Sequence, residues 1–312
     1  MPSSLGARRV AGSLALVIGL LLSAERADAY CRTTTQPLPP NYNPTQGCYV
    51  EGLPLFWKNA CIGYSINQAA SVQIPFDTAT VIIDKSFARW SKAKCADTGE
   101  KVGIDLSNNG PSVCAEVRYN PNSPNQNLIV FRDSAWPYSD PNNTLGLTTV
   151  TFNSETGEIY DADLEINSSG KNLTTVDNPP ENGFDLESVI THEAGHFVGL
   201  AHATDQKATM FASYKPGSTT LRTLTPDDVA GLCAIYPTSQ ERVVDTRVAA
   251  SGVIAAGQCD ANPRHGFTSQ CEEERSPKGR CSFAPPARSP VALGVGLAFG
   301  ALALLRRNRR RS

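Results

Sequence analysis

Three of the four histidines of this chain, His192, His196 and His202, fall within eleven residues. The first two are four residues apart, so on a helix they stand one turn above each other and their rings can reach one small ion. Gly199 lies between the second and third histidines, and a glycine accepts a positive φ, so the helix can end there and the chain can turn back. The spacing therefore predicts a helix, a sharp turn and a third imidazole over the same point.

The residue types in this window predict a catalytic zinc site. Neutral imidazole nitrogen binds zinc at about 2.0–2.1 Å, and three protein ligands leave a fourth position open for water. Glu193 directly follows the first histidine, so we expect it beside the metal as a base rather than as a ligand. The alternative is a helix whose histidines pack or cap without binding a metal.

The stretch 192–202 reads H-E-x-x-H-x-x-G-x-x-H and resembles the zinc signature of the metzincin metalloproteases. Met210 follows at the distance of the Met-turn of that clan, and Tyr214 resembles the tyrosine that helps to wall the S1′ pocket in matrixins. Ala203 and Ala212 depart from the matrixin pattern, which usually has Ser or Thr at the first position and Pro at the second. The resemblance implies an α+β catalytic domain with a twisted, mainly parallel sheet, an antiparallel edge strand, an active-site helix, a Met-turn and a C-terminal helix.

The resemblance also implies an activity, that of a zinc endopeptidase acting on a protein or peptide substrate as a monomer. His192, His196 and His202 would hold one Zn²⁺, and Glu193 would take a proton from the attacking water and pass it to the leaving amine. A zinc-containing surface binding module without turnover is the alternative from another class, although the intact Glu193 argues against it. An amidase or glycosidase on a zinc scaffold is a third reading, but the sequence has no paired carboxylates of the glycosidase kind.

The N-terminus has the features of a secretory signal peptide. Residues 1–29 carry two early arginines, an apolar run over 10–24 and an A-x-A site, which predicts cleavage before Tyr30. A membrane anchor is the alternative, but about 15 apolar residues fall short of the roughly 20 that span a bilayer. We therefore expect the protein outside the cell or on a bacterial cell surface.

The C-terminus, residues 282–312, predicts a membrane segment. An apolar run over 291–305 precedes five arginines, which is typical of an anchor with its arginines on the inner side. Together with Cys281, this arrangement resembles the C-terminal sorting signals of myxobacterial surface proteins, and the resemblance implies processing at Cys281. A plain tail anchor is the alternative.

The charge of the expected mature chain excludes one class of partner. The full chain of 312 residues has 28 basic and 30 acidic residues and a formal net charge of −2. Three arginines and two acids lie in 1–29, and five arginines lie in 306–311. Without them 20 basic and 28 acidic residues remain, a net charge of −8 for residues 30–305. No basic excess is left to attract a phosphate backbone, so we expect no nucleic-acid partner.

The expected organisation between the two ends has three parts: a linker or short pro-segment over 30–47, a catalytic domain over 48–238 and a cysteine-containing linker over 239–281. All nine cysteines follow residue 29, and a secreted context favours disulfides. With Cys281 set aside as the processing site, eight remain for four disulfides. Nearness in sequence suggests the pairs Cys95–Cys114 and Cys259–Cys271. A latency role for Cys31 or Cys48 on the zinc is an alternative to an ordinary disulfide.

Apolar periodicity predicts the elements around the metal site. The expected strands are 56–66, 128–131, 145–152 and 158–167, with 145–152 as the edge strand that binds substrate. The expected helices are 77–94 with Asp77 as N-cap, a helix capped by Asp185, and a helix from Thr225 to about residue 236.

Three carboxylates alternate on one face of the strand 158–167: Asp161, Asp163 and Glu165. The alternation predicts either a solvated face or a structural calcium site, because Ca²⁺ prefers oxygen ligands. Matrixins hold structural calcium near the equivalent strand, so the resemblance keeps the calcium interpretation open.

Overall fold

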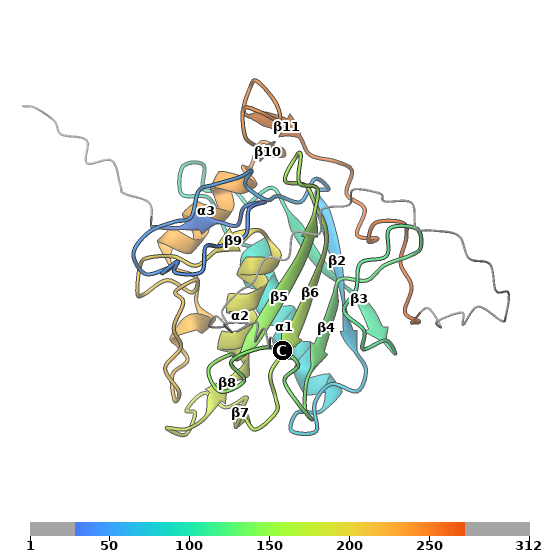
Figure 1. The fold of residues 1–312 in the computed structure, drawn as a ribbon, viewed down its shortest axis with the longest axis vertical. Helices are drawn as coiled ribbons and strands as arrows, with labels where there is room; N and C mark the ends of the chain where they lie inside the picture. The colour runs from blue at the N-terminus through green and yellow to red at the C-terminus, as the bar shows by residue number, and fades with distance from the viewer. Residues whose placement is uncertain (1–28, 272–312) are drawn as a thin grey trace, which may run out of the picture.

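The computed structural model describes residues 29–271, and a five-stranded mixed sheet lies at their centre (Figure 1). The strands are β2 (Cys61–Asn67), β3 (Asp105–Ser112), β4 (Leu128–Phe131), β5 (Gly146–Phe152) and β6 (Ile159–Ile166), in the order β3-β2-β4-β6-β5. β2 is parallel to β3 and β4, and β4 is parallel to β6, whereas β5 is antiparallel to β6. The α+β class with a mixed sheet is confirmed, and β5 lies at the edge, as expected for 145–152.

Two strands differ from the sequence prediction. β2 begins at Cys61 rather than at residue 56, because the residues before it make a single bridge, Phe56 to Glu158, and do not continue the ladder. β3 is missing from the prediction because its sequence, Asp-Leu-Ser-Asn-Asn-Gly-Pro-Ser, has no alternating apolar residues. It lies at the other edge of the sheet, where a strand with few apolar side chains and a proline is tolerated.

Three α-helices are present within 29–271: α1 (Phe76–Ser91), α2 (Leu186–Phe197) and α3 (Pro226–Ile235), with a short 3₁₀ turn, η1 (Thr220–Arg222), before α3. α1 and α2 lie on the same side of the sheet (Figure 1). Phe87 of α1 meets Phe197 of α2 edge-on, with ring centroids 5.1 Å apart. The indole N–H of Trp90 donates to the carbonyl of Thr191 at 2.8 Å. These buried aromatic contacts fix the helix that carries the first two histidines.

The helix starts test the capping signals. α1 begins after Pro75, which makes no side-chain cap, so the prediction of Asp77 as N-cap is wrong. Asp77 lies in the first turn instead, where its charge is favourable to the helix dipole. The prediction for Asp185 is confirmed, since its side chain accepts a backbone N–H in the first turn of α2. Thr225 caps α3 as predicted, in a reciprocal capping box with Asp228.

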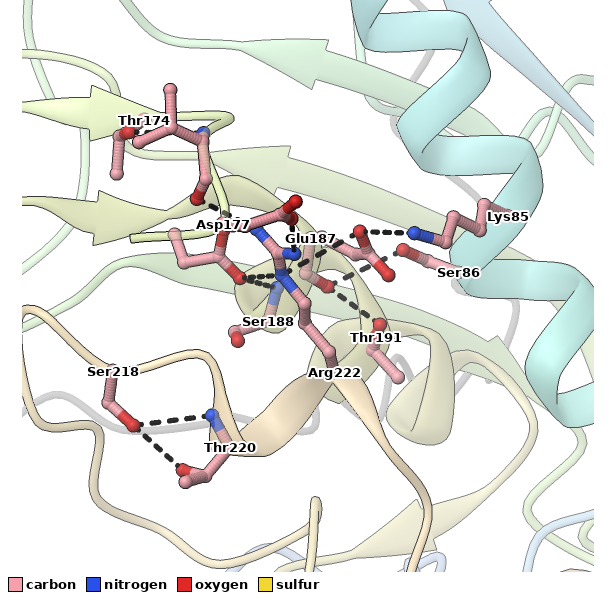
Figure 2. A network of polar contacts seen from close by, with 12 residues as sticks. Lys85, Ser86, Thr174, Asp177, Glu187, Ser188, Thr191, Ser218, Thr220 and Arg222 are labelled. Carbon is pink, nitrogen blue, oxygen red and sulfur yellow. Dashed lines mark hydrogen bonds and ion pairs between the residues drawn. The ribbon is translucent and has the colours of Figure 1, made fainter. Parts of the chain in front are cut away.

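A charge network joins α1, α2 and η1 (Figure 2). Lys85 of α1 places its Nζ 2.9 Å from Glu187 Oε2 at the start of α2. Arg222 of η1 donates from Nε to Asp185 Oδ2 at 2.8 Å and from Nη1 to Asp177 Oδ1 at 2.7 Å. Asp185 and Glu187 are buried, so these bonds hold the beginning of α2 against its neighbours.

Four disulfides connect distant parts of the described chain: Cys31–Cys48, Cys61–Cys259, Cys95–Cys233 and Cys114–Cys271. The predicted pairs Cys95–Cys114 and Cys259–Cys271 are therefore wrong. Nearness in sequence is a poor guide here because three of the four bonds span 138 to 198 residues, which only the folded sheet and helices bring together. Cys31 and Cys48 bind each other, so neither thiol serves as a latency ligand.

Several short strand pairs complete the structure: β1 (Cys31–Arg32) with β9 (Leu200–Ala201), β7 (Leu173–Thr174) with β8 (Phe184–Asp185), and β10 (Glu241–Val243) with β11 (Val253–Ala255). β1 belongs to the segment expected as a linker or pro-segment, and it pairs with the turn that follows α2.

The described part of the segment expected as a C-terminal linker packs on the rest of the domain. Arg242 is fully buried, and its guanidinium donates to the carbonyls of Trp57, Gly103 and Asn59 at 2.7–3.0 Å. Two disulfides attach the same segment to the sheet: Cys259 bonds to Cys61 of β2, and Cys271 bonds to Cys114, which follows β3. Residues 239–271 therefore contribute to the structure that surrounds the sheet.

Both predicted targeting segments lie outside the described residues, apart from Ala29 at the end of the expected signal peptide. Cys281, the expected processing site, also lies outside the described residues. Within 29–271, no helix is long and apolar enough to cross a membrane.

Candidate metal centre

The three imidazoles of His192, His196 and His202 converge on one point. His202 Nε2 lies 3.1 Å from His192 Nε2 and 3.1 Å from His196 Nε2. Two nitrogens bound to a tetrahedral zinc ion at about 2.0–2.1 Å are about 3.3–3.4 Å apart, so the spacing fits one shared ion. Within residues 29–271, these are the only three His, Cys, Asp or Glu side chains whose ligand atoms all lie within 4.8 Å of one another.

The other ring nitrogens of the two helix histidines contact carbonyl oxygens. His192 Nδ1 lies 2.6 Å from the carbonyl of Thr209, and His196 Nδ1 lies 2.8 Å from that of Leu200. A carbonyl only accepts, so each Nδ1 carries the proton and each Nε2 presents a lone pair. His202 Nε2 can donate to at most one of these two lone pairs, whereas a cation at the centre satisfies all three nitrogens. This donor set therefore fits a divalent metal.

Burial keeps the three rings in the neutral form that binds metal. Loss of hydration lowers the pKa of His192, and it lowers the pKa of His196 to about 3, with the charge of the neighbouring His192 as a further cause. Burial first, and then the two other rings, hold the pKa of His202 well below its usual value. The neutral imidazole is the form that binds a metal ion.

A left-handed turn brings the third histidine to the first two. α2 ends at Phe197, and Gly199 follows with φ +93°, a conformation that side chains disfavour. A Cβ at Gly199 would also lie 3.1 Å from the carbonyl oxygen of Leu55. The chain then pairs as β9 with β1 and delivers His202. This is the helix, glycine turn and third imidazole that the spacing predicts.

Met210 packs against α2 with 2% of its surface exposed. Its approach to α2 depends on Gly195, between the two helix histidines, because a Cβ there would lie 2.1 Å from Met210 Sδ. The same Cβ would lie 2.8 Å from Trp90 Cζ2 of α1. Gly195 therefore lets the Met-turn and α1 pack directly on the backbone of the active-site helix.

Asp228 of α3 holds the backbone of residues 209–210, and the sequence analysis does not identify it. Its carboxylate accepts from the backbone N–H of Thr209 at 2.8 Å and of Met210 at 3.0 Å. It also accepts from the N–H and the hydroxyl of Thr225 at 2.7 and 2.8 Å. Since Thr209 O accepts from His192 Nδ1, Asp228 is connected to a metal ligand through one residue. The sequence predicts the helix that begins at Thr225, but not this role of Asp228.

Glu193 points toward the edge strand β5 and is 5% exposed. Thr148 of β5 donates from Oγ1 to Glu193 Oε2 at 2.7 Å. Gly146, at the start of β5, leaves space for the carboxylate, because a Cβ there would lie 2.7 Å from Glu193 Oε1. Burial raises the pKa of Glu193 to about 7, although the hydrogen bond from Thr148 lowers it. Neither Thr148 nor Gly146 is identifiable from the sequence, because a strand residue shows its partner only after folding.

Tyr214, predicted to wall a substrate pocket, is fixed by two hydrogen bonds. Its hydroxyl donates to the carbonyl of Ser218 at 2.6 Å and accepts from the N–H of Asp185 at 2.8 Å. Its ring lies 6.0 Å from that of Phe184, centroid to centroid. These contacts connect the segment after the Met-turn to the start of α2.

The three carboxylates of β6, Asp161, Asp163 and Glu165, are 1%, 3% and 0% exposed, so the solvated-face alternative is wrong. Asp163 Oδ1 accepts from the N–H of Leu128 at 2.8 Å, and Glu165 pairs with Arg132. Asp161 Oδ1 has no hydrogen-bond partner. Burial and then the charge of Asp163 raise the pKa of Asp161 well above its usual value. The calcium interpretation stays a prediction.

Comparison with known proteins agrees with this geometry. Residues 118–237, which contain β4 to α3 and the whole metal centre, match the family model described as Matrixin. Metalloendoproteinase 1-MMP of Arabidopsis thaliana is 38% identical over 73 residues, 23% of this chain and 20% of that protein. Human matrix metalloproteinase-20 is 47% identical over 55 residues, 18% and 11% of the two chains. Human neutrophil collagenase is 30% identical over 110 residues, 35% and 21%.

Residues 118–237 are therefore similar to a Matrixin domain, and the mixed sheet and the histidine trio agree with that match. The chain spans only about a tenth to a quarter of the length of the first curated relatives that it matches. β2, α1 and β3 precede the matched residues, yet β2 and β3 complete the same sheet.

Proposed function

We propose that this chain is a zinc-dependent endopeptidase. The observation that carries the proposal is the convergence of the Nε2 atoms of His192, His196 and His202, with the carboxylate of Glu193 on the side of the edge strand β5. The names of the relatives, metalloendoproteinase and collagenase among them, support a peptide-bond substrate.

His192, His196 and His202 would hold the ion, and a zinc ion bound there supplies Lewis-acid chemistry that polarises a carbonyl and acidifies a water molecule. Glu193 acts as the general base: it accepts a proton from the attacking water and then delivers it to the leaving amine. Thr148 keeps the Glu193 carboxylate in place through its hydroxyl hydrogen bond. The raised pKa of the buried Glu193 suits a group that must both take up and release a proton near neutral pH.

The edge strand β5 is the substrate platform in this proposal. An extended peptide that adds to the edge of a sheet gains main-chain hydrogen bonds, and pockets for alternate side chains give specificity. Antiparallel addition to β5 would lay the peptide beside Gly146 and Thr148, which both contact Glu193. Tyr214 would then wall the S1′ pocket, as the matrixin resemblance implies.

The setting of the enzyme is part of the same proposal. We infer secretion through the signal peptide 1–29, with attachment to the cell surface through residues 282–312 and processing at Cys281. The four disulfides of the described residues support an oxidising, extracellular environment. Monomeric action, no nucleic-acid partner and a structural Ca²⁺ at Asp161, Asp163 and Glu165 complete the proposal.

The test is the variant Glu193→Gln, compared with the matched variant Glu155→Gln in an exposed turn. Glu193→Gln should retain one zinc per chain by elemental analysis and lose about 10²–10⁴-fold in cleavage of a quenched-fluorescent peptide library. Glu155→Gln should retain both. Full activity of Glu193→Gln would contradict the role of the carboxylate. A wild-type protein that holds zinc but cleaves no peptide would favour a binding module without turnover.

A further inference from the structure

A hollow lies beside the metal centre, and the proposed function leaves it unused. His196 and His202 line one end, so the hollow is continuous with the site of the proposed reaction. Two walls matter for the inference: the strand β5 and residues 31–49, which we call the N-terminal loop.

β5 supplies the first wall through Thr148, Val150 and Phe152. These residues alternate along the strand, so their side chains stand on one face of β5. Thr148 is the residue that contacts Glu193, and Phe152 is at the far end of the strand. The wall therefore begins at the proposed catalytic carboxylate and becomes apolar with distance from it.

The N-terminal loop supplies the second wall through Leu38, Tyr42 and Tyr49. The two tyrosine rings meet edge-on with centroids 5.9 Å apart. Leu38 is 44% exposed, which is unusual for a large apolar side chain. Facing Val150 and Phe152, these side chains make a slot that suits an apolar or aromatic group.

This second wall is held in place at both ends. The disulfide Cys31–Cys48 closes the loop. At its base, Thr33 donates from its N–H to Gly199 O at 2.9 Å and from Oγ1 to Leu200 O at 3.0 Å. Gly199 and Leu200 form the turn that delivers His202, so the loop is attached directly to the metal centre. The tyrosines are therefore positioned before any substrate binds, which lowers the entropic cost of binding.

The polarity of strand addition decides which part of a substrate meets the slot. β5 runs from Gly146, next to Glu193, to Phe152. A peptide antiparallel to β5 runs the other way, so residues on the N-terminal side of the scissile bond lie toward Phe152. At about 3.3 Å per residue, Val150 is about 7 Å beyond Thr148, which corresponds to the second or third residue before the scissile bond.

We propose that the N-terminal loop and β5 form a specificity subsite that takes an aromatic side chain two or three residues before the scissile bond. Tyr42 and Tyr49 determine this preference by packing against the substrate ring. The inference rests on the proposed peptidase function and on its substrate direction.

The experiment compares pairs of quenched-fluorescent peptides that differ only in Phe or Ala at the second or third residue before the cut, with the cut located by mass spectrometry. The wild type should prefer Phe at one of these positions by about ten- to hundredfold in kcat/KM. The double variant Tyr42→Ala/Tyr49→Ala should reduce that ratio to about threefold or less. Val50→Ala, on an exposed side chain next to the loop that does not line the hollow, should leave the ratio unchanged.

A second readout does not depend on turnover: binding of the labelled Phe and Ala peptides to zinc-loaded Glu193→Gln, measured by fluorescence anisotropy. Loss of the Phe preference in binding, when Tyr42 and Tyr49 are also replaced, supports the subsite. An equal loss of affinity for the Phe and Ala peptides means that the tyrosines have only a structural role. A gain of cleavage activity on all peptides means that the loop covers the site. Either result overturns the inference. Activity with no Phe preference overturns the subsite alone, whereas absence of cleavage and of peptide binding overturns the proposed function with it.

Discussion

Replacing Asp228 tests how the metal centre is supported from below. The side chain is 1% exposed, and its carboxylate accepts four hydrogen bonds, from the N–H groups of Thr209, Met210 and Thr225 and from the Thr225 hydroxyl. Asp228→Ala would leave the N–H groups of Thr209 and Met210 buried without an acceptor. Each such group costs about 1–3 kcal/mol, so we expect a loss of about 2–6 kcal/mol in the free energy of unfolding.

Asp228→Asn separates the charge from the shape. The amide keeps one acceptor oxygen, but its NH₂ group faces backbone donors. We therefore expect the loss in the free energy of unfolding to be roughly half of that for Asp228→Ala. Thr209 O orients His192, so displacement of the Met-turn should also weaken zinc binding by about 10–100-fold in both variants. A typical domain has a stability of about 5–15 kcal/mol, so we expect the alanine variant to depend on bound zinc for much of its remaining stability.

The assays are denaturant unfolding of the zinc-loaded and zinc-free proteins and competition for zinc with a chromogenic chelator. Asp205→Asn is the matched control, because its carboxylate accepts one exposed N–H, from Lys207, in the same region. It should change the unfolding free energy by about 0.5 kcal/mol or less. The reasoning fails if both Asp228 variants unfold like the wild type and retain its zinc affinity.

Three further predictions address the carboxylates and the metal. Gly146→Ala places a Cβ 2.7 Å from Glu193 Oε1, so the kcat of this variant should fall by about 10²-fold while its zinc content stays unchanged. If the variant keeps the kcat of the wild type, the Glu193 carboxylate is free to move. The pKa of Asp161 is raised in the folded state, so the wild type loses stability as pH rises above about 4. The melting temperature of Asp161→Asn should therefore exceed that of the wild type, by an amount that grows toward pH 8. Added Ca²⁺ should reverse that difference only if the ion binds at Asp161. Chelation of zinc should lower the melting temperature of the wild type more than that of His202→Ala, and equal shifts would place the metal elsewhere.

Local signals were reliable where one short stretch contains the whole interaction. The three histidines of the candidate metal centre are four and six residues apart, and Asp185 caps a helix that begins at the next residue. β4 occupies 128–131 as predicted, since its four residues form a short apolar run. The cap of α1 was the exception, because Pro75 starts that helix without a side-chain hydrogen bond.

Signals from pairing partners were absent or misleading. β3 has a polar sequence and is a strand only because β2 offers it a parallel edge. The alternation of Asp161, Asp163 and Glu165 suggested a solvated face. The three side chains are buried, and Glu165 forms an ion pair with Arg132. Periodicity shows that two faces differ, but it does not show what covers each face.

The sequence by itself determined the window of three histidines, the acid that follows the first of them and the turn before the third, because helix geometry and a glycine at one position fix those distances over eleven residues. Only the tertiary structure decided the support of that window: Asp228 under the Met-turn, Gly146 and Thr148 around Glu193, the disulfide pairs, and the N-terminal loop beside the site. These contacts join residues 17 to 198 positions apart, and their formation depends on how the sheet and helices pack as a whole, which no local pattern encodes.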